Sequence, residues 1–232
     1  MQKIVTLLAV LFVSTAIEAR ADLITNGSFE TTVPVVAVGT FNLYTPGSTG
    51  VTGWTVVGNA GTDIGVVNAL NQSGIFFPAQ SGSNWVDLTG LNTNSMTQGV
   101  AQTIATIIGD SYTLTFWVGN VDSPSTGFGI TSTVNVSANG SSLGAFTNSC
   151  TACTTLLSWQ MFTSTFTATS ASTTLQFLNG DPANDNSNGL DTVSLVDNGP
   201  SVTPVVPEPS SIMLLGTALI GLAAVALLRA RS

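Results

Sequence analysis

Residues 111–118 read Ser-Tyr-Thr-Leu-Thr-Phe-Trp-Val, and this stretch decides the fold class. Large apolar side chains alternate with small polar ones, and the apolar face consists of Tyr112, Leu114, Phe116 and Val118. Alternation with a period of two predicts a β-strand that buries one face and exposes the other. Trp117 interrupts the pattern, because its position on the strand puts it opposite the apolar face.

Similar short runs of β-branched and aromatic residues recur on both sides of this strand, separated by Gly, Asn, Ser and Asp. The other predicted strands are residues 54–57, 64–67, 85–88, 100–105, 130–138, 160–167, 173–178 and 192–196. No segment between residues 22 and 197 keeps a helical period. So many strands without crossover helices predict an all-β fold, a two-sheet antiparallel jelly-roll sandwich formed by residues 22–197.

Charge excludes several functions. The chain of 232 residues has 4 Lys and Arg, 12 Asp and Glu, and no His. Residues 22–206 contain no Lys or Arg and ten acidic side chains, a formal charge of −10. Without cations this region cannot neutralise phosphates, which excludes nucleic-acid binding and phosphoryl transfer. Without His it lacks the commonest general base and a major zinc ligand.

The N-terminal 21 residues have the order of a secretory signal peptide. Lys3 is followed by an apolar segment at residues 4–13 and by Ala19-Arg20-Ala21, a small-x-small cleavage site. We expect export and cleavage before Asp22. The alternative is a retained N-terminal anchor, which the short apolar segment disfavours.

The C-terminal end has a second, different apolar segment. Residues 212–228 are uncharged and mostly apolar, which is the lower limit for one transmembrane helix, and the tail 229–232 carries Arg229 and Arg231. By the positive-inside rule this basic tail lies in the cytoplasm and the body outside it. The Pro-rich linker 198–211 precedes the helix, and its prolines keep it extended and accessible to a protease.

This linker contains Pro207-Glu208-Pro209, and Pro-Glu-Pro followed by one hydrophobic helix and an arginine-rich end resembles the PEP-CTERM sorting signal of Gram-negative bacteria. The resemblance implies an exosortase as partner, with cutting at or near this sorting motif. The helix would then be a transient anchor in the inner membrane. The body would pass to the cell surface or to the extracellular matrix of a biofilm. The alternative is a permanent single-pass anchor.

The body itself resembles galactose-binding-like jelly rolls, which include carbohydrate-binding modules of families 4, 9 and 22 and DUF642 domains. The resemblance rests on residues 22–30 (Asp-Leu-Ile-Thr-Asn-Gly-Ser-Phe-Glu) and 189–195 (Gly-Leu-Asp-Thr-Val-Ser-Leu). Gly53-Trp-Thr, the segments 82–90 and 99–103, and the strand 111–116 follow in the expected order. It covers roughly residues 22–197.

In those modules a structural calcium ion commonly ties the first strand to the last. The resemblance implies Glu30 and Asp191 as its ligands, and hard carboxylate oxygens suit Ca²⁺. Thr192 departs from the pattern, because relatives often have a second acid there. The oxygen-rich segment 181–189 is a further source of ligands, although its Asp and Asn residues are equally explained as turn formers and caps.

Sugar binding would use an exposed aromatic ring stacked on a pyranose face. The candidate platforms are Trp117, Trp54 and Trp85, with Trp159 as the fourth tryptophan. Trp117 is the best of them because its position on the strand opposes the core face. The competing interpretation is that these rings fill the core of the sandwich.

Cys150 and Cys153 form a C-x-x-C pattern. No βαβ pattern surrounds it, and an exported chain meets an oxidising compartment, so we expect a local disulfide rather than a redox site.

Together these observations predict a non-catalytic exported protein that binds exopolysaccharide or another cell-surface glycan. A structural or self-assembling surface protein without a glycan ligand is the alternative. A glycoside hydrolase is a third reading, disfavoured because Glu30 is the only Glu in residues 22–206 and is already explained at the first strand.

Overall fold

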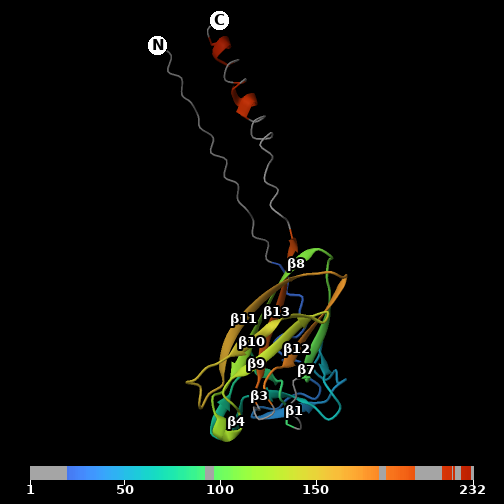
Figure 1. Ribbon diagram of the computed structural model, residues 1–232, viewed down its shortest axis with the longest axis vertical. Coiled ribbons are helices and arrows are strands. Elements are labelled where there is room, and N and C mark those ends of the chain that lie inside the picture. Colours follow the sequence, from blue (N-terminus) through green and yellow to red (C-terminus); the bar gives the residue numbers. More distant parts are fainter. Residues whose placement is uncertain are drawn as a thin grey trace. The chain divides into compact units, whose positions relative to one another are not determined.

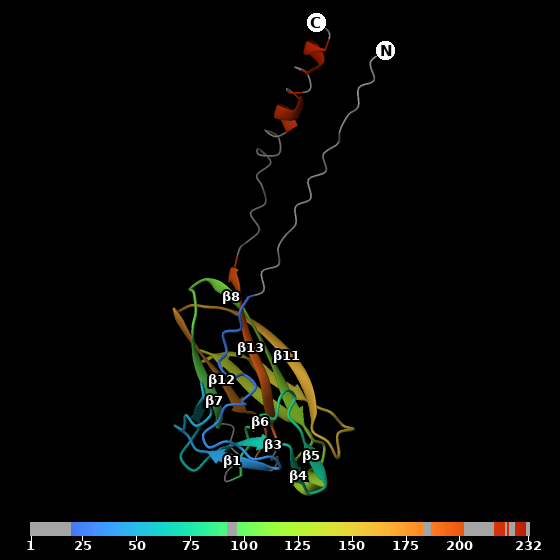
Figure 2. The ribbon, with the colours of Figure 1, turned by 180° about the vertical axis from the view of Figure 1, so that it is seen from behind.

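The computed structural model describes residues 20–91, 97–182, 187–201, 216–220, 222 and 226–230. The chain divides into two compact units, Met1–Gly199 and Pro200–Ser232, which are described separately. The first unit is a body built from two sheets (Figure 1), and the view from behind shows the opposite side of the same body (Figure 2).

One sheet has six strands in the order β1-β3-β6-β13-β8-β11. Their bounds are β1 Thr40–Tyr44, β3 Ile64–Asn68, β6 Asn84–Asp87, β13 Gly189–Pro200, β8 Asp110–Asn120 and β11 Ser158–Thr167. The pairs β1·β3, β3·β6, β6·β13 and β8·β11 are antiparallel.

The other sheet has five strands in the order β10-β9-β12-β7-β2. Each strand in it is antiparallel to its neighbours. Their bounds are β10 Ser141–Asn148, β9 Ser132–Ala138, β12 Ser172–Asn179, β7 Gly99–Ala105 and β2 Thr55–Val57. A separate hairpin pairs β4 (Leu70–Gln72) with β5 (Ile75–Phe77), and η1 (Pro124–Thr126) is a short 3₁₀ turn. The predicted all-β sandwich is therefore confirmed.

The main core lies between the two sheets and follows the alternation of residues 111–118. Tyr112, Leu114, Phe116 and Val118 on β8 are all buried there, whereas Trp117 points to the other side of the sheet and is partly exposed. Each predicted strand overlaps an observed one. The strands that the pattern missed are β1, β4, β5 and β10.

Turn residues explain why the missed strands form where they do. Asn139 and Gly140 both have positive φ values, 48° and 79°, and connect β9 to β10 as a two-residue hairpin loop. Ser73 (φ 53°) and Gly74 (φ 79°) do the same between β4 and β5. A Ser-Gly pair before an Ile-Phe-Phe run was thus a usable signal for the second hairpin.

Several expectations fall on residues that the structure does not describe. These are the signal peptide apart from Arg20 and Ala21, and the sorting motif Pro207, Glu208 and Pro209. In the second unit, residues 216–220, 222 and 226–229 are helical. Among the described residues, no helix reaches the length and apolarity needed to cross a membrane.

Candidate functional site

A second hydrophobic cluster covers part of the outer face of the six-stranded sheet. Val67 on β3 and Trp85 on β6 point outward, away from the main core, because their neighbours Val66 and Val86 point inward. The cluster also contains Ile75, Phe77, Val121, Phe128 and Leu157. The β4–β5 hairpin and the segment 121–128 thus bury one end of a face that strand alternation alone would leave in water.

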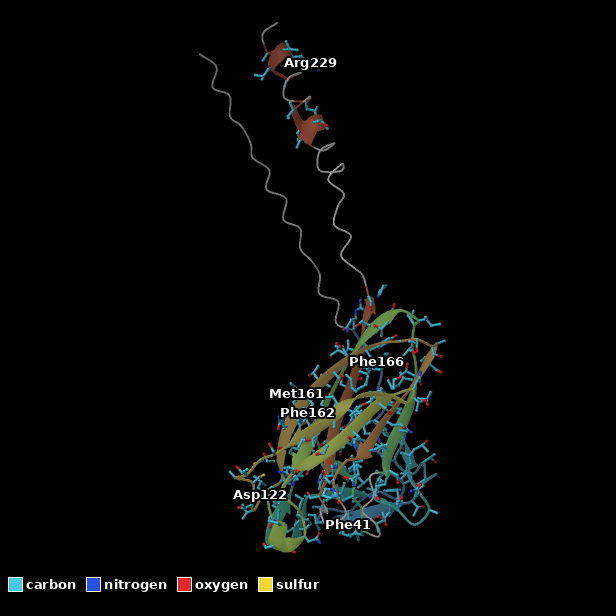
Figure 3. All side chains as sticks on the ribbon, viewed as in Figure 1. Phe41, Asp122, Met161, Phe162, Phe166 and Arg229 are labelled. Atoms are coloured by element: carbon cyan, nitrogen blue, oxygen red, sulfur yellow. The ribbon has the colours of Figure 1, made fainter. Side chains whose placement is uncertain are left out.

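Aromatic rings form the walls of a pocket in this cluster. Phe77 stacks on Trp85 with ring centroids 6.3 Å apart and meets Phe128 edge-on at 5.1 Å. Trp159 meets Trp85 edge-on at 5.8 Å. The pocket is narrow and partly open to solvent, and Phe41 of β1 lines it from the sheet edge. Figure 3 shows Phe41 near the end of the body where β1 lies.

Asp87, at the end of β6, is the acidic group of this pocket. It also lines an adjoining, more polar hollow that includes Thr126 and Gly127. Asp87 Oδ1 accepts hydrogen bonds from Thr89 N (3.0 Å), Thr89 Oγ1 (2.7 Å) and Asn188 N (3.4 Å). The carboxyl group of Asp87 therefore lies between the aromatic pocket and the adjoining polar hollow.

Burial raises the pKa of Asp87 to about 6, and the negative charge of Asp63 acts in the same direction. The hydrogen bonds from Thr89 and Asn188 stabilise the carboxylate and oppose this shift. A perturbed acid in a concave, mainly apolar pocket is a feature typical of ligand sites.

Beyond the pocket, the outer face continues as a strip of partly exposed side chains. Trp117 on β8 pairs in register with Met161 on β11, which is 54% exposed. Figure 3 labels Met161 on this edge strand. Thr115 and Thr163 form the next outward-facing pair along the two strands and add hydroxyl groups. This strip combines flat apolar surface with uncharged hydrogen-bonding groups.

Trp159 joins the strip to the pocket. It pairs with Gly119, two positions from Trp117, and its Nε1 donates to Pro78 O at 3.1 Å. A Cβ atom on Gly119 would lie 2.9 Å from the Trp159 ring, and one on Gly189 would lie 3.0 Å from it. Two glycines are therefore required for the ring to lie flat on the sheet. We call the pocket, Trp159 and the Trp117–Met161 strip together the outer-face site.

The structure separates the tryptophan candidates. Trp54 is buried in the main core at 1% exposure, packs against Phe29 and Phe177, and donates from Nε1 to Asn26 O at 3.0 Å. It has no free face for a sugar, so its assignment as a platform is wrong. Trp85 is also buried but forms a wall of the pocket, and Trp117 has a partly exposed ring.

Sequence reasoning missed Phe41, Phe77, Phe128 and Met161. Phe77 lies on the missed hairpin and Phe41 on the missed edge strand, so their pattern signals were short. Phe128 lies in a connection without periodicity.

Glu30 and Asp191 are brought together by the loop 80–84. Glu30 Oε1 accepts from Ser83 N and Asn84 N, both at 2.9 Å. Asp191 Oδ2 accepts from Gln80 N (2.8 Å) and Ser81 N (3.1 Å). Burial raises the pKa of Asp191 to about 7, and the charge of Glu30 adds to the shift. The two carboxylates therefore anchor one loop and repel each other.

Next to these carboxylates lies a neutral oxygen that a hard cation could bind, the side-chain oxygen of Asn84. Asn84 Nδ2 donates to Phe29 O (3.2 Å) and Glu30 O (3.4 Å), which fixes the orientation of the amide and leaves the buried Oδ1 without a partner. Within the described residues, no three His, Cys, Asp or Glu side chains form a metal cluster. A calcium ion here would have to combine Glu30 and Asp191 with neutral oxygens.

The cysteines differ from the expectation. Cys150 and Cys153 are both free thiols, and Cys153 Sγ donates to Cys150 O at 2.9 Å. The two cysteine side chains nevertheless lie close to each other, because a side-chain hydrogen bond also joins them. Burial raises the pKa of Cys153 to about 11, which makes it a poor thiolate.

Comparison with protein families gives two matches. The family described as "Protein of unknown function (DUF642)" matches residues 22–196, and the PEP-CTERM protein-sorting motif matches residues 205–231. The second match implies a secreted protein with a C-terminal membrane-anchoring sorting signal that an exosortase processes. No curated protein matches this sequence.

Solved structures give likenesses in fold. The Stig cyclase Fisc from Fischerella sp. TAU, in complex with (3Z)-3-(1-methyl-2-pyrrolidinylidene)-3H-indole, aligns with a TM-score of 0.55 at 18% identity, covering 78% of this chain and 100% of its own. The apo form of a cyclase from Fischerella sp. also aligns with a TM-score of 0.55 at 18% identity, covering 79% of this chain and 99% of its own. A structure described as "CBM4 structure and function" aligns with a TM-score of 0.41 at 18% identity, covering 75% of this chain and 99% of its own.

Proposed function

This chain belongs to the DUF642 family and ends in a PEP-CTERM sorting motif, and from this premise we propose that it is a non-catalytic surface or extracellular-matrix protein that binds polysaccharide on its outer-face site. The observation that supports the proposal is that aromatic rings, a carboxyl group and hydroxyl groups lie together at this site. An aromatic pocket with one carboxyl group is connected through Trp159 to an exposed Trp117–Met161 strip with threonine hydroxyls.

The chemistry of these groups fits sugars because a pyranose has an apolar face and a rim of hydroxyls. Indole rings offer surfaces for the face, and Asp87, Thr115 and Thr163 offer acceptors and donors for the rim. The absence of Lys and Arg from residues 22–206 favours neutral sugars over acidic ones.

Glycan binding is tested with the exported protein on a glycan array that includes the producing cell's own exopolysaccharide. We expect saturable binding that Trp117→Ala weakens about 5- to 150-fold, since stacking on one aromatic ring, as for a nucleic-acid base, is worth about 1–3 kcal/mol. Ile107→Ala is the matched control, because Ile107 is 61% exposed in the loop before β8, at the far end of that strand from Trp117.

The outcomes distinguish the alternatives. Binding that is equal in the Trp117→Ala and Ile107→Ala variants would place any ligand elsewhere. Binding to no glycan at all would reject the proposal and favour a structural surface protein.

A catalytic role would need a second carboxylate able to reach a glycosidic bond. Asp63 is the acid whose negative charge acts on Asp87. Asp63 is fully buried, and its Oδ1 accepts a hydrogen bond from Leu91 N at 2.8 Å. Its role is to hold the loop that follows β6, so we propose a binding function without hydrolysis.

We also propose that calcium binds at Glu30 and Asp191. Saturating Ca²⁺ is expected to raise the melting temperature of chelator-treated protein, because an ion at about 100 times its Kd stabilises the folded state by about 2.7 kcal/mol. Glu30→Gln should remove most of this shift, whereas Asp122→Asn, which changes a carboxylate outside the loop contacts, should keep it. Equal shifts in both variants, measured by differential scanning calorimetry, would contradict the assignment.

A further inference from the structure

A second group of buried polar side chains lies where four strands meet. It comes from the end of β8, the start of β9, the end of β12 with Asp181 just after it, and the two residues before β13. All of these residues are at most 1% exposed: Asn120, Ser132, Asn179, Asp181, Ser187 and Asn188. So many buried polar groups must be satisfied by one another or by a bound species.

Thr133 on β9 places two of these side chains next to each other. Its backbone N donates to Asp181 Oδ1 at 2.6 Å, and its backbone O accepts from Asn188 Nδ2 at 2.5 Å. Asn179 Oδ1 connects the same two residues a second time, because it accepts from Asp181 N (3.1 Å) and from Asn188 Nδ2 (2.7 Å). The Asp181 carboxylate and the Asn188 amide therefore flank a single residue.

The orientation of the Asn188 amide is fixed by its partners. Both groups that Nδ2 contacts are acceptors, Thr133 O and Asn179 Oδ1, so exchanging the amide oxygen and nitrogen would turn two hydrogen bonds into repulsions. Asn188 Oδ1 consequently points away from them, and it is buried without a hydrogen-bond partner.

Ser187, the residue before Asn188, also has a buried side-chain oxygen without a hydrogen-bond partner. Its backbone O accepts from Ser132 Oγ at 2.5 Å, while its own Oγ is buried and neither donates nor accepts a hydrogen bond. Each buried oxygen left without a partner costs about 1–3 kcal/mol, so two on adjacent residues are unusual. Oxygens without donors, next to a buried carboxylate, are what a hard cation binds.

We propose that Asp181, Ser187 and Asn188 form a site for a hard divalent cation, Ca²⁺, separate from the one at Glu30 and Asp191. The Asp181 carboxylate supplies the charge, Ser187 Oγ and Asn188 Oδ1 supply neutral oxygens, and water completes the coordination. One carboxylate gives a low charge count, so the affinity belongs to the range of extracellular modules, a Kd of about 10⁻⁴–10⁻³ M.

This cation site has a structural link to the outer-face site. Ser187 lines the aromatic pocket, and Asn188 N donates to Asp87 Oδ1 at 3.4 Å. A bound ion would hold residues 187 and 188 in place and with them one wall of the pocket. This consequence, unlike the cation site itself, rests on the proposed function.

The test measures Ca²⁺ binding to the purified exported protein, first stripped with chelator, by isothermal titration calorimetry. It is carried out in the Glu30→Gln background, so that the first site does not contribute. We expect one weak site, which Asp181→Asn abolishes and Ser187→Ala weakens about tenfold. Asp122→Asn serves as the control and should bind as the background protein does.

Ser187→Ala keeps the proposal falsifiable if Asp181→Asn does not fold, because it removes only an oxygen without a partner. In chelator its melting temperature should equal or exceed that of the background protein, and with Ca²⁺ it should fall below it. No Ca²⁺ binding in the Glu30→Gln background, or unchanged affinity in Ser187→Ala, would overturn the cation site and leave bound water as the partner of these oxygens. Either result leaves the glycan-binding proposal open to its own test.

Discussion

Replacing Trp54 with alanine is expected to lower the free energy of unfolding by about 3–5 kcal/mol, the cost typical of removing a buried aromatic side chain. The ring packs against Phe29 and Phe177 at centroid distances of 5.2 and 5.9 Å, so its loss opens a cavity in the main core. It also leaves Asn26 O without its 3.0 Å hydrogen bond.

Chemical denaturation monitored by circular dichroism measures this effect, and Trp117→Ala is the matched control. Trp117 is only partly buried on the outer face, so its truncation should cost less than about 1 kcal/mol. The two substitutions should also separate in function, because only Trp117→Ala removes a proposed sugar platform. Equal destabilisation by both would contradict the assignment of Trp54 to the core and of Trp117 to the surface.

The second large effect expected is a loss of stability as the pH rises through the titration of Asp87. Its pKa is raised from 3.8 to about 6 in the folded protein, so the folded state binds the proton more tightly than the unfolded chain does. Stability therefore falls as the pH rises from about 4 to above 6. The full difference is about 3 kcal/mol at 1.36 kcal/mol for each pKa unit.

Asp87→Asn should remove this part of the pH dependence and melt at a higher temperature than the wild type at pH 8. Melting temperatures between pH 4 and pH 8, in the presence of chelator, measure the change. The negative charge of Asp63 is the neighbouring charge that contributes to the shift, and it remains in the variant. A wild-type stability that is constant or rises over this range, with the same curve in Asp87→Asn, would contradict the prediction.

How far strand patterns predict this fold depends on burial. Residues 111–118 show clear alternation because β8 has one face in the main core. β10 was missed because most of its side chains are partly or fully exposed, so that nothing selects for apolar residues at every second position. β1, β4 and β5 are three to five residues long, too short for a period to show.

The same reasoning explains why the outer-face site was only partly predicted. Alternation correctly put Trp117 opposite the core face of β8, and in the structure Trp85 on β6 also points away from the main core. Trp85 is buried because the β4–β5 hairpin packs over it, a contact between segments that no local pattern contains. Asp87 has no motif of its own, and its pocket exists only once β1, β3, β6 and the segment 121–128 are assembled.

By itself, the sequence determined the β class, the acidic body without cations and the order of sorting motif, apolar segment and basic tail, because each depends on composition or on spacing along the chain. Only the tertiary structure decided which tryptophans face solvent, that Cys150 and Cys153 are free thiols, and that Asp181 and Asn188 both bind the backbone of Thr133. These are properties of contacts between distant residues. Burial, and with it the pKa of Asp87 and the need of a buried oxygen for a partner, is set by what packs around a side chain and not by its neighbours in sequence.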